Sequence, residues 1–228
     1  MSHDVAAAIE RVRERIALPC QRSGRDASSV QLVSVSKGHP EELIRVAYDA
    51  GMRVFGENYA QELAEKATRL SDLSDIGWRF IGHLQRNKIK LIERAQATVD
   101  TVDSLRLAEA ISARATARGA TVEVLVQVNI GDERQKSGCK PEEVPALVES
   151  VRALPNVTLR GLMTVAPHLE DAEDTRPFFA ALRELAQAQG LPELSMGMTH
   201  DLDQAVEEGS TMLRIGTAIF GPRPAIKP

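Results

Sequence analysis

The run VEVLVQV, residues 122–128, is the clearest strand in the chain, because four of its seven residues are valine and a fifth is leucine. Apolar spacing predicts helices on both sides of it, at about 104–118 and 141–153. A strand between two helices is typical of a parallel sheet, since parallel neighbours need a crossover connection. This run therefore indicates the α/β class.

The same pairing of a strand with a helix recurs along the whole chain. Short β-branched runs predict eight strands, at about 31–36, 53–55, 78–81, 98–101, 122–128, 159–165, 193–196 and 212–215. Helices are expected between them, at about 40–50, 59–70, 87–95, 104–118, 141–153, 175–189 and 201–208. Eight such units can close into a single (β/α)8 TIM barrel, and the alternative is an open doubly wound sheet.

An extra helix is expected before the first strand, at about 3–22, because Val5, Ile9 and Val12 have helical spacing. Pro19 is expected to end this helix or to lie just beyond its end. No linker and no change of composition divides the chain, so residues 1–228 are expected to form one domain.

Composition argues against several classes of protein. The 28 Lys and Arg residues against 32 Asp and Glu give a net charge of −4, which does not favour nucleic acid as a partner. No apolar run approaches the roughly 18 residues of a membrane-spanning helix, and no secretory signal is recognisable. Cys20 and Cys139 lie far apart and are expected to be free thiols, so a cytoplasmic protein is expected.

One lysine occupies an unusual position. Lys37 follows the first strand and precedes Gly38, at the rim where a barrel concentrates its chemistry. If it points into the mouth of the barrel, burial lowers its pKa and leaves an amine that can attack a carbonyl group. The alternative is a loop lysine that reaches solvent.

The ends of the last two strands supply a second signal, because the loops there often bind phosphate in barrels of this kind. The residues expected to contact an anion are Ser195, Gly197, Gly216 and Thr217. The alternative is that the two glycines only make tight turns. Arg214 lies within an apolar strand, so it needs either a ligand or a carboxylate partner.

A lysine, a phosphate site and an arginine on one rim suggest pyridoxal 5′-phosphate as cofactor. Lys37 would hold the aldehyde, the last two loops the phosphate, and Arg214 would face the pyridine nitrogen. Because arginine does not give up its proton, the ring nitrogen would stay unprotonated and the ring would be a weak electron sink. The residues therefore predict a cofactor that is bound but chemically subdued.

Seven motifs carry a family resemblance: SVSKGHP (34–40), FGENYAQE (55–62), FIGHLQRNK (80–88), VNIGDERQKSG (128–138), LRGLMTV (159–165), SMGMTHD (195–201) and GSTMLRIGTAIFG (209–221). From about residue 5 to 222 the chain resembles the pyridoxal phosphate homeostasis protein family. This YggS/PROSC-like group is related to the N-terminal barrel of alanine racemase. The resemblance implies a (β/α)8 barrel that holds pyridoxal 5′-phosphate as a Schiff base on Lys37.

The resemblance also implies roles for individual residues. It assigns phosphate contacts to Ser195, Gly197, Gly216 and Thr217, the pyridine nitrogen to Arg214, and places near the cofactor to Asn58 and Met163. The family carries or buffers the cofactor within the cell, and catalytic turnover is not established as its function.

One position departs from the family sequence, and four other residues are expected to have only minor roles. His39 stands where members often have a second lysine, and it would titrate near neutrality if exposed. Lys136 could reach the mouth of the pocket, although a solvated loop lysine is favoured. His83 could support the residues that contact the cofactor, although a satisfied rim histidine is favoured. Asp201 and Glu57 are expected only to favour helix starts.

The preferred function is a non-catalytic carrier of pyridoxal phosphate, with apo-enzymes as possible recipients. The main alternative is a minimal amino-acid racemase, which needs a second acid/base that neither Tyr48 nor Tyr59 is well placed to supply. A cofactor-free Schiff-base lyase and a protein-interaction module are further alternatives. A monomer is expected, because the chain leaves no room for the second domain that pairs racemase subunits.

Overall fold

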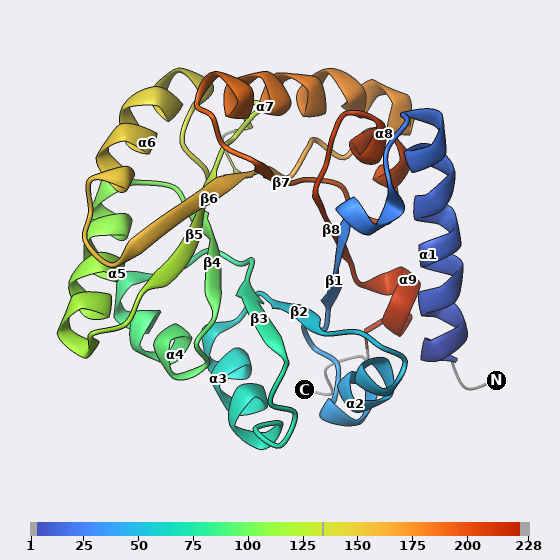
Figure 1. Ribbon diagram of the computed structural model, residues 1–228, viewed down its shortest axis with the longest axis horizontal. Helices are drawn as coiled ribbons and strands as arrows, with labels where there is room; N and C mark the ends of the chain where they lie inside the picture. The colour runs from blue at the N-terminus through green and yellow to red at the C-terminus, as the bar shows by residue number, and fades with distance from the viewer. Residues whose placement is uncertain (1–3, 134, 224–228) are drawn as a thin grey trace.

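The computed structural model describes residues 4–133 and 135–223. Within them, eight parallel strands close into a barrel in chain order, with the last strand paired to the first (Figure 1). The strands are β1 Gln31–Val35, β2 Val54–Glu57, β3 Gly77–Phe80, β4 Thr98–Val102, β5 Val122–Gln127, β6 Val157–Met163, β7 Glu193–Ser195 and β8 Met212–Ile215. The closed barrel confirms the predicted (β/α)8 fold and excludes the open sheet.

The helices form an outer layer around the barrel (Figure 1). They are α1 Val5–Arg22, α2 Glu41–Asp49, α3 Ala60–Arg69, α4 Ile89–Arg94, α5 Leu105–Arg118, α6 Val144–Arg152, α7 Arg176–Ala188, α8 Leu202–Glu207 and α9 Thr217–Phe220. Short 3-10 turns occur at Ala27–Ser29, Arg86–Lys88, Pro141–Glu143 and Ala172–Thr175. The sequence analysis did not predict α9, a single turn that follows β8 directly.

The strand that was clearest in the sequence is also the best paired. β5 pairs with β6 over six residue pairs, from Val122↔Val157 to Gln127↔Met163. From Val124 to Gln127 the strand is buried without a break. Strands of a parallel barrel are covered on both faces, so they appear as apolar runs rather than as alternating patterns.

The first and last strands close the barrel side by side. Their pairing runs from Gln31↔Met212 to Ser34↔Ile215. Helix α1 packs against α8 and α9 on this side of the molecule (Figure 1). It buries the predicted stripe of Val5, Ile9 and Val12, which Ile16 continues. Closure of the barrel therefore brings the first and last elements of the chain into contact.

The prediction that Pro19 ends the first helix is wrong, because α1 continues to Arg22 with Pro19 inside it. Proline lacks one backbone donor, which costs a single hydrogen bond when it stands in the last turn. The Pro19 carbonyl accepts hydrogen bonds from the Ser23 backbone N–H at 3.0 Å and from Ser23 Oγ at 2.7 Å. Those bonds and the burial of Pro19 stabilise the end of the helix.

Some strand boundaries also differ from the predictions. β2 runs on to Glu57 instead of ending at residue 55, and β6 spans Val157–Met163 rather than 159–165. No described helix is both long and apolar enough to span a bilayer. Cys20 and Cys139 are buried free thiols, as predicted.

Candidate functional site

Lys37 lies two residues beyond the carboxyl end of β1, at the mouth of the barrel. It is half-buried, and within residues 4–133 and 135–223 its ammonium has no hydrogen-bond or ion-pair partner. Burial is the main cause that lowers the pKa of Lys37. The nearby Arg223 and Arg214 cations lower it further, and the Glu57 carboxylate acts in the opposite direction.

This environment gives a testable pH dependence. We expect the rate at which Lys37 reacts with trinitrobenzenesulfonate to reach half its maximum below pH ~10.4, the pKa of an unperturbed lysine. The reagent attacks only the neutral amine, and a lowered pKa supplies that form at a lower pH. Peptide mapping across a pH series measures the midpoint, which should fall further in Glu57→Gln. A midpoint at or above the unperturbed value contradicts the assignment.

Arg214 is buried inside the barrel and is held at both ends of its guanidinium group. Its Nη1 donates to Ser195 Oγ at 2.8 Å, and its Nη2 donates to the Thr164 carbonyl at 2.7 Å. Burial lowers the pKa of Arg214 to about 10, so the group is still a cation at neutral pH. Because Ser195 Oγ accepts this bond, its own proton stays available to a further acceptor.

The loops after β7 and β8 lie beside each other at the same rim. Gly197 has φ +94°, and an added Cβ would lie 2.4 Å from Ala205 Cβ and 2.7 Å from Leu213 Cδ2. The fold itself therefore requires glycine here, in agreement with the tight-turn alternative. Gly216 precedes Thr217, the first residue of α9, and an added Cβ would lie 3.2 Å from the Val35 carbonyl. Contact of this rim with a phosphate stays a prediction.

Asn58 and Met163, the two residues added by the family resemblance, line one cavity of about 170 Å³. It opens among residues that follow β2, β3, β5 and β6, with Gln127 and Asn129 in its wall. Asn58 Oδ1 is buried and accepts no hydrogen bond from the part of the chain that the structure describes. A buried acceptor without a partner is costly, which marks this atom as a candidate ligand contact.

Three expectations about neighbouring residues need correction. Lys136 is not a solvated loop lysine, since it lines the Asn58 cavity and donates to the Ala166 carbonyl at 2.9 Å. His39 is not exposed, since it is buried against Phe220 with ring centroids 5.2 Å apart. Glu57 does not start a helix; it ends β2, fully buried.

Two other minor predictions have clearer outcomes. His83 is an exposed rim residue whose Nδ1 lies 3.2 Å from Ser137 Oγ, and it also lines the Asn58 cavity. Asp201 precedes α8, and its Oδ1 accepts from the Met198 backbone N–H at 2.7 Å. That bond orders the loop that contains Gly197, which is more than a helix-start preference.

Sequence reasoning missed three charged residues near the site. Asp100 is fully buried in β4, and its Oδ2 and Oδ1 accept hydrogen bonds from Arg79 Nε at 2.9 and 3.1 Å. Arg223 lies close enough to Lys37 to lower its pKa. The signal for Asp100 and Arg79 was available, since each is a charged residue inside an apolar strand; Arg223 gave no such signal.

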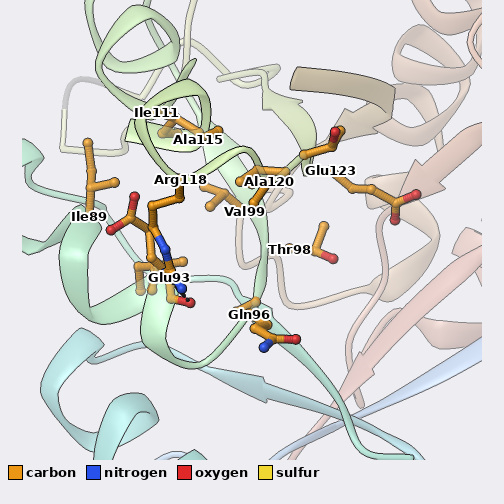
Figure 2. A pocket seen from close by; sticks show the side chains of 14 residues that line it. Ile89, Glu93, Gln96, Thr98, Val99, Ile111, Ala115, Arg118, Ala120 and Glu123 are labelled. Carbon is orange, nitrogen blue, oxygen red and sulfur yellow. Dashed lines mark hydrogen bonds between the residues drawn. The ribbon is translucent and has the colours of Figure 1, made fainter. Parts of the chain in front are cut away.

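A larger cavity, of about 430 Å³, lies at the other end of the barrel, among α4, α5 and the starts of β4 and β5 (Figure 2). Ile89, Val99 and Ile111 line it, and its Glu93 is already paired with Arg114 at 2.7 Å. None of the predicted site residues lines this cavity. Cavity size alone therefore does not identify the functional end of this barrel.

The closed barrel carries a lysine after its first strand, unpaired among the residues that the structure describes, and a buried arginine in its last strand. The profile described as "Alanine racemase, N-terminal domain" matches residues 10–224, which places the chain in that class of protein. The chain belongs to the pyridoxal phosphate homeostasis protein family.

Relatives of that name share much of the sequence over nearly their full length. The one from Aquifex aeolicus is 44% identical over 221 residues, which cover 94% of this chain and 96% of the relative. The one from Pseudomonas aeruginosa is also 44% identical over 221 residues, with 96% of both chains covered. These relatives are named as homeostasis proteins and not as enzymes.

Solved structures agree with this assignment. PipY from Synechococcus elongatus, described as having PLP bound, superposes with a TM-score of 0.83 at 36% identity, covering 95% of this chain and all of that one (100%). An alanine racemase from Clostridium difficile has a TM-score of 0.71 at 14% identity, covering 94% of this chain and 57% of the racemase. The racemase likeness concerns the fold alone.

Proposed function

We propose that this protein binds pyridoxal 5′-phosphate at the mouth of its barrel and takes part in the homeostasis of that cofactor, without catalysing a reaction on it. The observation that carries the proposal is Lys37, half-buried at the barrel mouth with no partner in the described residues. The PLP-bound relative PipY supports the choice of ligand.

The residues present fit this cofactor on structural grounds. When bound, it supplies an aldehyde that an amine can attack, a phosphate dianion and a ring nitrogen. Lys37 offers an amine with a lowered pKa, and Asn58 Oδ1 is a buried acceptor left without a hydrogen bond among the residues described. The backbone at Gly216 lies where a side chain would crowd the Val35 carbonyl.

Each site residue has a proposed part in holding the cofactor. Lys37 Nζ is the point of covalent attachment, and Arg214 faces the ring nitrogen from inside the barrel. The residues proposed for the phosphate are Ser195, Gly197, Gly216 and Thr217. Asn58 and Met163 stand beside the ring. Ser195 has a further part, because its bond to Arg214 fixes the guanidinium group.

The surroundings of the two tyrosines favour a carrier over a racemase. Tyr48 Oη donates to Asp75 Oδ1, and its ring lies under Arg53, which directly precedes the start of β2. Tyr48 therefore lies toward the opposite end of the barrel from Lys37. Tyr59 is largely exposed at the start of α3. Neither is held as the second acid/base that two-sided proton transfer requires.

The proposal extends to the organisation of the protein in the cell. Residues 1–228 act as one cofactor-binding domain, present as a monomer in the cytoplasm. Apo-enzymes that need the cofactor are the proposed recipients, and neither nucleic acid nor membrane is a proposed partner.

Absorbance spectra before and after borohydride, followed by peptide mapping, test the proposal. We expect the purified protein to take up pyridoxal 5′-phosphate and, after reduction, to carry it on Lys37. A protein that takes up none contradicts binding. Incubation with L-alanine tests the carrier assignment separately, since a loss of optical activity that depends on the bound cofactor would show a racemase.

A further inference from the structure

A largely buried cluster of charged residues contacts the backbone that carries Lys37. It consists of Lys66 and Glu62 from α3 and Glu57 from the end of β2. Lys66 is 5% exposed and Glu57 is 0% exposed, so both charges are removed from water. Burial of charges at this depth is costly unless they are paired, which calls for an explanation of the cluster.

Lys66 uses all three of its donors, two within the cluster and one on the backbone next to Lys37. Its Nζ lies 2.7 Å from Glu57 Oε1, 2.7 Å from Glu62 Oε1 and 2.7 Å from the Ser36 carbonyl. An ammonium group has three N–H donors, so none is left for a ligand. Lys66 is therefore a fixed cation and not a second attachment point.

The cluster forms hydrogen bonds with the residues on both sides of Lys37. On one side, Ser36 Oγ donates to Glu57 Oε1 at 2.7 Å while its carbonyl accepts from Lys66. On the other side, the Gly38 backbone N–H donates to Glu62 Oε1 at 2.7 Å. Gly38 has φ +71°, a conformation that favours glycine and turns the chain sharply after the lysine.

The contrast between backbone and side chain is the informative point. Residues 36 and 38 are held by hydrogen bonds to charged groups, and such bonds are stronger than those between neutral groups. The Lys37 ammonium has no partner in the portion of the chain described. A reactive side chain needs this combination, in which the backbone that carries it is fixed and its reacting atom is free to meet a ligand.

We propose that Lys66, Glu57 and Glu62 are positioning residues that aim Lys37 into the barrel mouth by fixing the backbone on either side of it. The inference rests on the proposed function for the identity of the ligand. The geometry itself concerns only the chain's own residues, so it can be tested with a reagent that is not the cofactor.

Glu62→Ala is the test variant, because Glu62 is partly exposed and its loss still leaves Lys66 paired with Glu57. Glu62→Gln is the rescue variant, since its amide oxygen can still accept from Gly38 and Lys66. Glu65→Ala is the matched control on the same helix, where Glu65 pairs only at the surface with Arg69 and Gln61. Thermal unfolding of all three identifies any general loss of stability.

Two readouts separate positioning from a purely structural effect. In Glu62→Ala we expect hydrogen exchange at the Gly38 amide to quicken roughly tenfold as its charged acceptor is lost. We expect labelling of Lys37 by pyridoxal 5′-phosphate, trapped with borohydride, and by trinitrobenzenesulfonate to slow roughly tenfold or more. Glu62→Gln should restore both rates, and Glu65→Ala should match the unaltered protein.

Unchanged labelling of Lys37 in Glu62→Ala would overturn the inference, as would equal slowing in Glu65→Ala. If the unaltered protein takes up no pyridoxal 5′-phosphate, the proposed function fails instead. In that event the trinitrobenzenesulfonate rates and the Gly38 exchange still decide whether the cluster positions Lys37.

Discussion

Replacing Lys37 by methionine is expected to abolish the borohydride-stable adduct and to weaken retention of pyridoxal 5′-phosphate by roughly 100-fold or more, about 2.7 kcal/mol of binding free energy. Methionine keeps most of the side-chain length but has no nucleophilic amine. The remaining affinity would come from the contacts proposed for the phosphate and the ring. Equilibrium dialysis and mass spectrometry of the reduced protein measure the two effects.

The variant should not lose stability. A lysine whose pKa is lower in the folded than in the unfolded state makes stability rise with pH between those two values. At neutral pH it is therefore an unfavourable charge, and its removal should leave the unfolding midpoint unchanged or higher. Lys136→Met is the matched control, because Lys136 is already bonded to the Val165 and Ala166 carbonyls and should not be the attachment point. An adduct that persists in Lys37→Met contradicts the assignment.

Replacing Asp100 by asparagine is expected to lower the free energy of unfolding by about 3–5 kcal/mol. Asp100 is fully buried, and both of its oxygens accept from Arg79 Nε. Its charge also favours the cationic form of the buried Arg214. Without that carboxylate the buried Arg79 keeps only the looser ion pair with Glu193, 3.9 Å away, and Arg214 loses one of the nearby negative charges that favour it. The thermal midpoint should therefore fall by about 6–20 °C.

Two comparisons sharpen this prediction. The exposed pair Asp72–Arg45, 2.6 Å apart, is the surface counterpart, and Asp72→Asn should leave the thermal midpoint almost unchanged because solvent screens that pair. The double variant Asp100→Leu with Arg79→Met removes both charges of the buried pair and should recover much of the loss. Calorimetry gives all three midpoints. A midpoint for Asp100→Asn within the range of the Asp72 variant would contradict the role given to the buried pair.

The overall architecture could be predicted because it depends on local patterns. Apolar runs such as 122–128 mark strands that are covered on both faces, and their regular alternation with helices leads to a closed barrel. Pro19 and α9 could not be placed in this way. The helix tolerates Pro19 because of contacts in its last turn, and α9 is too short to leave a periodic signal.

The rim of the site was predictable for a similar reason, since the ends of parallel strands meet wherever the barrel closes. The positions of Lys37, Arg214 and Ser195 in their strands predicted that they lie near one another, and the structure places them so. Their contact with a cofactor stays a prediction. The sequence could not show that Glu57 pairs with Lys66 instead of lying at a helix start, or that Asp100 pairs with Arg79. Such pairings depend on which side chains face each other after the ring has formed.

The pairing of β1 with β8 also determines when the site comes into existence. During synthesis the ribosome releases β1 early and β8 last, so a nascent chain carries Lys37 long before it carries Arg214 and Gly216. Contacts between such distant segments form late and slowly. The proposed site is thus complete only in the finished polypeptide, and a prematurely terminated chain would present Lys37 without Arg214 and Gly216.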